Sequence, residues 1–153
     1  MGFKDGRLTA PSALVEGQRL LPLLQGLYST VPASVDFDAL AVRLRVIAAD
    51  VESGEAVVLS RGNLARAVRA SMAVPGFFSP VKLGGRVLVD GGIADNLPVG
   101  VTRALGADVL IAVELYADLK KADQLRSMAD IAGQMISILL KQNSDIQHLS
   151  LIH

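Results

Sequence analysis

The sequence predicts an α/β fold with a mostly parallel central sheet. Residues 108–115 (DVLIAVEL) form an apolar run bounded by polar residues, which is typical of a strand buried on both faces. A helical pattern over residues 99–105 precedes that run, and a helix followed by a strand favours a right-handed crossover in a parallel sheet. A β-branched run, residues 86–89, ends in Asp90 and a glycine turn, where open α/β folds place catalytic and binding groups.

The composition bounds the size and compartment of the protein. The chain has 153 residues, enough for one domain or for part of a larger one. Hydrophobic residues make up 51% of it, which fits either a well-buried α/β domain or a fragment that packs against an absent half. We find no signal peptide behind Met1 and no apolar run long enough to cross a bilayer. We therefore expect a cytoplasmic protein, at most peripherally associated with a membrane.

Charge and residue usage exclude several function classes. Fifteen basic and fifteen acidic residues cancel, without a basic block or an aromatic stacking platform, so we predict no nucleic-acid partner. The absence of cysteine excludes disulfides, thiolate catalysis and cysteine zinc sites. No Gly-x-Gly-x-x-Gly follows a strand, and we predict no cofactor.

The first third of the chain carries no identifiable chemistry. Residues 1–11 read as a loop, and Ser12 is placed to cap a helix that extends to Leu27. Pro22 interrupts its pattern, which leaves two short helices or one kinked helix. Residues 28–36 are a turn-rich linker.

A β-hairpin follows. Residues 40–49 read as a strand entering a sheet, Ser53 and Gly54 as a tight turn, and residues 56–59 as the returning strand. Asp50 ends the first strand. It is either a second catalytic carboxylate or a strand-end aspartate that accepts from turn amides, and we favour the second reading.

The next helix is predicted to begin after the N-cap Asn63 and to stop at Pro75–Gly76. Ser71 falls inside that helix, so we interpret it as a buried serine bonded to a carbonyl one turn back, not as a nucleophile. The pattern predicts Arg66 and Arg69 outside or at the edge, and an inner face of Leu64, Ala67, Val68, Ser71 and Met72.

The centre of the chain lies after this helix. A short strand, a Gly-Gly turn and the strand 86–89 lead to Asp90. Gly91 and Gly92 then allow positive φ and close approach to another group. The adjacent pair Phe77 and Phe78 either packs in the core or lines an acyl-chain pocket.

The ordered motifs of this region resemble the C-terminal half of the patatin-like phospholipase family. They are residues 69–77 (RASMAVPGF), 89–92 (VDGG), 95–98 (DNLP) and 105–108 (LGAD), with residues 37–40, 48–50 and 53–55 in the same order upstream. The resemblance implies that residues 1–153 are the C-terminal portion of a single domain with a three-layer α/β/α fold.

The resemblance also implies a reaction. Proteins of that family are similar to serine hydrolases with a Ser–Asp site: a Gly-x-Ser-x-Gly serine, the aspartate of Asp-Gly-Gly as its base, and a glycine-rich oxyanion loop. Asp90 matches the aspartate, and Gly91 and Gly92 shape its turn. Neither the serine elbow nor the glycine-rich loop occurs in the 153 residues, and we expect both upstream of Met1.

Two functions are therefore compatible with the sequence. The first is the base-bearing half of a lipid acyl hydrolase, inactive alone, whose substrate is an acyl lipid or phospholipid. The second is a non-catalytic binding or oligomerisation module. In either case we expect an isolated half to self-associate through exposed apolar surface.

The remaining polar residues receive lesser roles. Asp95 and Asn96 are a cap or a support for the loop, and Asp90 with Asp95 lacks the further ligands that a metal needs, so we predict no metal site. His148 and His153 lie in the tail, far along the chain from Asp90, and do not support a Ser-His-Asp triad.

The C-terminal region completes the prediction. Residues 118–123 read as a charged linker, and residues 125–139 as an amphipathic helix. Its apolar face, with two methionines, packs in the core by default or contacts a membrane or partner.

Overall fold

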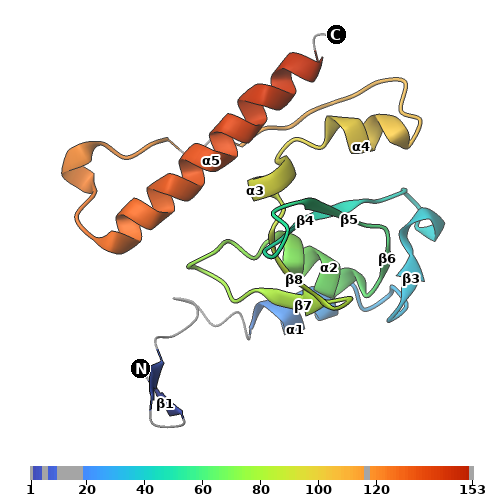
Figure 1. The fold of residues 1–153 in the computed structure, drawn as a ribbon. Coiled ribbons are helices and arrows are strands. Elements are labelled where there is room, and N and C mark those ends of the chain that lie inside the picture. Colours follow the sequence, from blue (N-terminus) through green and yellow to red (C-terminus); the bar gives the residue numbers. More distant parts are fainter. Residues whose placement is uncertain (1, 5–6, 10–18, 116–117, 152–153) are drawn as a thin grey trace.

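The computed structural model describes residues 2–4, 7–9, 19–115 and 118–151, which form a mixed α/β fold (Figure 1). The strands are β1 (Gly2–Lys4), β2 (Arg7–Thr9), β3 (Val35–Asp36), β4 (Val46–Asp50), β5 (Ala56–Leu59), β6 (Arg61–Gly62), β7 (Val81–Leu83) and β8 (Arg86–Asp90). The helices are α1 (Leu20–Leu27), α2 (Leu64–Ser71), α3 (Gly92–Asp95), α4 (Val99–Ala104) and α5 (Met128–Leu151), with short 3₁₀ turns η1 (Phe37–Ala39) and η2 (Ala122–Gln124).

Every strand pair in the described residues is antiparallel. The described strands therefore do not form the mostly parallel sheet that the sequence predicted. β1 pairs with β2, β3 with β6, and the main sheet has the order β5-β4-β8-β7. The predicted central strand 108–115 is the source of the difference, because it pairs with no described strand. Its apolar side chains except Leu110 are exposed, up to 88% for Leu115.

The predicted hairpin is confirmed, although its first strand is shorter than expected. β4 and β5 pair from Val46–Leu59 to Ala49–Ala56, around a turn in which Gly54 has φ 75°. Residues 40–45 are outside the strand because Arg45 turns back to Asp38, donating hydrogen bonds of 2.8 and 2.9 Å to its two carboxylate oxygens. The second hairpin is also as predicted, with Gly84 and Gly85 both at positive φ between β7 and β8.

The N-terminal prediction is partly wrong. Residues 2–4 and 7–9 form the β1–β2 hairpin instead of a loop, while Ser12 lies outside the described residues. Over its described length the first helix is a single segment, α1. Pro22 lies in its first turn, where the missing N–H has no intrahelical acceptor to lose.

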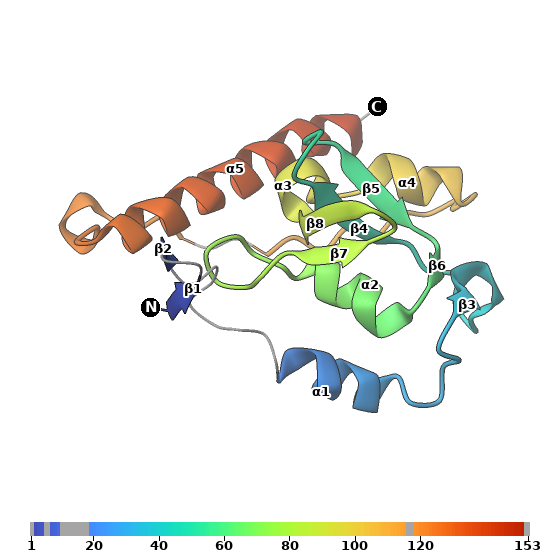
Figure 2. The ribbon, with the colours of Figure 1, turned by 60° about the horizontal axis from the view of Figure 1, so that its bottom comes forward.

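α2 lies against one face of the main sheet, and α1 lies beneath α2 in Figure 2. Asn63 caps α2 as predicted, since its side chain accepts from the Arg66 amide at 2.9 Å. Small side chains bring the helix close to the sheet. They form two core clusters, Ala67 with Phe37, Val46 and Leu64, and Ala70 with Ala48 and Leu88.

The predicted inner face of α2 is wrong at two positions. Arg69 is buried, not peripheral, and Met72 is exposed. The Arg69 guanidinium lies 5.2 Å from the centroid of the Phe78 ring and donates to the Ser79 carbonyl at 3.1 Å. These contacts draw Arg69 inward, and desolvation lowers the pKa of its guanidinium.

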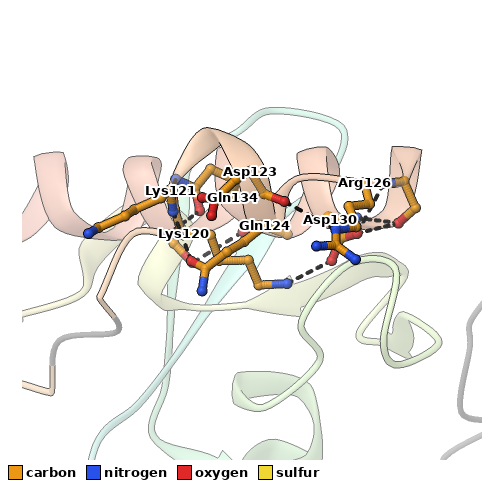
Figure 3. Close-up of polar contacts among 10 residues, drawn as sticks. Lys120, Lys121, Asp123, Gln124, Arg126, Asp130 and Gln134 are labelled. Atoms are coloured by element: carbon orange, nitrogen blue, oxygen red, sulfur yellow. Dashed lines mark hydrogen bonds and ion pairs between the residues drawn. The ribbon is translucent and has the colours of Figure 1, made fainter.

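α5 starts three residues later and runs further than predicted. Ser127 and Asp130 form a reciprocal N-terminal cap, in which the Asp130 amide donates to Ser127 Oγ and the Ser127 amide donates to Asp130 Oδ2. Figure 3 shows the preceding charged segment folded against this end: Lys120 Nζ lies 2.7 Å from Asp130 Oδ1, and Gln134 Nε2 donates to the Lys120 carbonyl. The predicted linker is thus an ordered part of the helix cap.

The apolar face of α5 is exposed, so core packing is the wrong interpretation for it. We call this face the apolar stripe; it comprises Met128, Ile131, Met135, Ile138, Leu139 and Ile146. The opposite side of α5 packs on α3 and α4. Among the described residues no helix has the length and apolar character needed to span a membrane.

Candidate functional site

A cavity of about 450 Å³ opens beside the end of β8. Three segments bound it: the start of β4, the C-terminal end of α2, and the turn from β8 into α3. Its lining residues are Arg45, Val46, Ile47, Val68, Ser71, Met72, Asp90, Gly91, Gly92, Asp95, Asn96 and Pro98. The cavity thus brings the turn after Asp90 together with residues that lie 18 to 45 positions earlier in the chain.

Asp90 is the last residue of β8 and lies opposite Ala48 of β4 in the centre of the main sheet. Its amide donates to the Ala73 carbonyl at 3.0 Å, which ties the strand end to the end of α2. Its carboxylate Oδ1 accepts from the Gly92 amide at 2.9 Å. The half-buried side chain is therefore fixed on one oxygen by the turn that follows it.

Close approach requires a glycine at position 91, whereas the nearest atoms to Gly92 are ends of side chains, and neither glycine has positive φ. Gly91 has φ −68° and Gly92 is the first residue of α3. A Cβ on Gly91 would lie 2.2 Å from the Ile47 carbonyl oxygen, so β4 leaves no room for a side chain. A Cβ on Gly92 would lie 2.6 Å from both Asn96 Oδ1 and Leu140 Cδ2.

Two carboxylates in the cavity have raised pKa values. Burial raises the pKa of Asp90, and the hydrogen bond from the Gly92 amide offsets part of that effect. Burial likewise raises the pKa of Asp95, offset in part by the hydrogen bond from Gln147. A carboxylate whose pKa lies above its ordinary value is a better proton acceptor than a fully solvated one.

Ser71 lies in the same cavity and differs from its predicted environment. The residue is half-buried, and its hydroxyl has no hydrogen-bond partner among the described residues, so the predicted bond to a carbonyl one turn back is absent there. Its main-chain carbonyl instead accepts from the Gly91 amide at 3.4 Å. Ser71 therefore contributes backbone to the turn of Asp90 and a hydroxyl to the cavity wall.

The other predicted candidates lie elsewhere. Asp50 is a turn aspartate, as favoured: its Oδ1 accepts from the Glu52 amide at 3.1 Å and its Oδ2 lies 3.8 Å from Arg86. Phe77 is 44% exposed and Phe78 lies under Arg69, so neither is a fully buried core residue and neither lines the cavity.

His148 does not line the cavity. His148 lies on α5 and contacts Glu114, while His153 lies outside the described residues. Within the described ranges, no group of three or more His, Cys, Asp or Glu side chains is arranged to hold a metal ion.

Three α5 residues contact the site region and were not identified from the sequence. Asn143, Ser144 and Gln147 all contact the segment from Gly92 to Leu97. About fifty residues separate the partners, and no local pattern signals a contact at that separation. Asp95 and Asn96 have the supporting role predicted as one of two options, while Pro98 occupies the N-cap of α4.

Comparison with known proteins identifies the family. The profile of the patatin-like phospholipase family matches residues 3–103. An uncharacterized NTE family protein of Mycobacterium tuberculosis is 35% identical over 109 residues, which is 71% of this chain and 30% of that protein. Another, from Mycobacterium bovis, is 36% identical over 72% of this chain and 18% of its own length.

A mammalian protein is similar over a shorter region. Patatin-like phospholipase domain-containing protein 7 of Mus musculus is 39% identical over 71 residues, 45% of this chain and 5% of that protein. The chain spans less than a third of the length of these curated relatives. Since the family profile matches more than half of its residues, the chain belongs to the patatin-like phospholipase family.

Proposed function

We propose that this chain is the base-bearing, C-terminal portion of a patatin-like lipid acyl hydrolase, with Asp90 as the general base. The serine of a Gly-x-Ser-x-Gly elbow, which the printed sequence lacks, would attack the acyl carbonyl after passing its proton to Asp90. The C–O bond to the alcohol would then break, and Asp90 would return the proton to the departing alcohol, which leaves an acyl-enzyme ester. Water would attack this ester as it passes a proton to Asp90, and Asp90 would return that proton to the serine oxygen as the fatty acid leaves. The substrate class is an ester of an acyl lipid or phospholipid.

The observation that carries the proposal is the position of Asp90. Its carboxylate lines the cavity, burial raises its pKa, and the adjacent glycines leave the turn without side chains. One carboxylate oxygen accepts from the Gly92 amide, which fixes its orientation. A lone carboxylate needs such partial burial to accept a serine proton at neutral pH.

The proposal assigns a role to the exposed segment 108–115. We propose that it is a strand of the three-layer domain, and that its parallel neighbour belongs to the nucleophile-bearing portion. Its apolar side chains Val109, Ile111, Val113 and Leu115 are each more than three-quarters exposed in this structure. Pairing with a further strand would bury them, as expected for a strand with apolar residues throughout.

A hybrid protein tests the role of Asp90. This chain would replace the matched region of the Mycobacterium tuberculosis relative, and p-nitrophenyl butyrate hydrolysis would be measured for the hybrid and its Asp90→Asn variant. We expect Asp90→Asn to lower kcat by roughly 100-fold or more, since a general base contributes about that factor. Asp50→Asn is the matched control, because Asp50 ends the neighbouring strand outside the cavity. Full activity of the Asp90→Asn hybrid would show that Asp90 is not the base.

A second function, a non-catalytic binding or oligomerisation module, is favoured by a different observation. The apolar stripe of α5 and the side chains of Val109, Ile111, Val113 and Leu115 are all exposed, which is more apolar surface than isolated exposed residues explain. Self-association that persists in the hybrid, without any hydrolysis or fluorophosphonate labelling, would favour this function over the first.

A further inference from the structure

We propose that α5 positions Asp90 through a polar latch, formed by Asn143, Ser144 and Gln147 on the segment from Gly92 to Leu97. The latch is defined by the hydrogen bonds that these three side chains make with that segment. The catalytic importance of this positioning rests on the function proposed above, in which Asp90 is the general base. The hydrogen bonds of the latch are present in the structure whether or not Asp90 has that role.

The three residues of the latch lie on one side of α5. Gln147 lies four residues after Asn143 and three residues after Ser144, so it shares a side of the helix with each of them. The apolar stripe lies on the other side. α5 therefore meets the segment from Gly92 to Leu97 with three polar side chains as well as Leu140, while the apolar stripe is exposed.

Asn143 and Gln147 hold both ends of the segment. The Asn143 side-chain amide donates to the main-chain carbonyls of Gly92 and Ile93. Gln147 accepts from the Leu97 amide through Oε1 at 2.6 Å and donates through Nε2 to Asp95. Both the oxygen and the nitrogen of the Gln147 side-chain amide thus have a partner, which restricts the rotation of that side chain.

Ser144 is the buried centre of the latch. Its side chain is 1% exposed, and its Oγ accepts from Asn96 Nδ2 at 2.7 Å. Leu140, one turn earlier, lies so close that a Cβ on Gly92 would approach its Cδ2 to 2.6 Å. Figures 1 and 2 both show α5 running directly beside α3.

The connection to Asp90 is short. The Gly92 amide donates to Asp90 Oδ1, while the carbonyl of the same residue accepts from Asn143. A shift of α3 away from α5 would therefore move the donor that orients the Asp90 carboxylate and would admit water to it. The family profile ends at residue 103, so α5 lies outside the matched region. Asn143, Ser144 and Gln147 are therefore outside the residues that the profile matches.

A matched pair of substitutions tests the latch in this chain, without any catalytic readout. Gln147→Met removes both hydrogen bonds and keeps the side-chain length; Gln142→Met makes the same change at an exposed position of α5. Amide hydrogen exchange and an NMR pH titration of the Asp90 carboxyl carbon would be measured for both. Circular dichroism would establish that the helix content is retained.

For Gln147→Met we expect the amides of Leu97 and Gly92 to exchange about tenfold faster. We expect the Asp90 titration to move toward its ordinary range near 3.9, because burial affects its pKa more than the Gly92 hydrogen bond does, so the admitted water outweighs the loss of that bond. Asn143→Ala is expected to act in the same direction, and Gln142→Met to leave both unchanged. Faster exchange at Leu97 alone, with Gly92 and the Asp90 titration unchanged, would overturn the proposal. Amide exchange and the Asp90 titration do not depend on hydrolytic activity. The latch can therefore fail this test while the hydrolase function holds, and the reverse is also possible.

Discussion

A Cβ atom on Gly91 would lie 2.2 Å from the main-chain carbonyl oxygen of Ile47. Gly91 follows directly after β8, and Ile47 lies in the neighbouring strand β4, so the added Cβ would meet backbone and no side-chain rotation would relieve the contact. It explains why the residue after Asp90 has no side chain, although its φ of −68° is accessible to any residue.

Gly91→Ala is therefore expected to destabilise the fold. Overpacking against a backbone costs about 2 kcal/mol or more, which corresponds to a Tm lower by roughly 4 °C or more. Thermal unfolding followed by circular dichroism measures the change. Gly100→Ala is the control, because a Cβ there meets nothing within 4 Å, and its Tm is expected to be unchanged or slightly higher. Equal Tm values for the two variants would contradict the close approach.

Asp90→Asn is expected to raise Tm at neutral pH. Burial raises the folded-state pKa of Asp90 above its unfolded value, so the carboxyl contributes stability that is fully present below the unfolded pKa, near 3.9, and is lost as the pH rises through the folded pKa. The gain in Tm on substitution should therefore be near zero at pH 3 and grow toward pH 7. Because Asp90 is only half-buried, solvent screening limits the gain to roughly 1–2 °C.

A pH series of thermal melts measures this difference, with Asp108→Asn, an exposed carboxylate outside the cavity, as the control. A gain that shrinks as the pH rises would mean that burial does not raise the pKa of Asp90.

Acidification is expected to release the N-terminal cap of α5. Hydrogen bonds from Lys120 and Ser127 lower the pKa of Asp130 to about 2. A depressed carboxylate pKa contributes stability above the unfolded value and loses it as the pH falls, here between about 4 and 2. The Ser127 amide signal should titrate with a midpoint near 2 by NMR. Lys120→Gln should move that midpoint upward, and an unchanged midpoint would show that the ion pair in Figure 3 does not form in solution.

The isolated chain is expected to self-associate through its exposed apolar surface. Val113→Lys and Met135→Lys place charges on side chains that are 77% and 59% exposed, so they should lower the association measured by sedimentation without lowering Tm. Val42→Lys changes an exposed valine in the bend before β4 and serves as the control. A wild-type chain that stays monomeric at high concentration would contradict this prediction.

Local patterns determined much of this protein. The helix cap at Asn63, the two hairpins with their glycines, the strand that ends at Asp90 and the turn role of Asp50 all follow from interactions between residues close in the sequence. The ordered motifs from residue 69 to residue 108 also identified the family, because short motifs in a fixed order can be recognised from the sequence alone.

The tertiary structure decided what depends on distant partners. Residues 108–115 have the composition of a buried strand, but a strand forms only where another strand supplies hydrogen-bond partners, and none of the described residues does so. Arg69 was expected outside or at the edge of the helix and is buried, because its guanidinium lies over the Phe78 ring and donates to the Ser79 carbonyl. The latch joins residues about fifty positions apart, and only the packing of α5 on α3 brings them together.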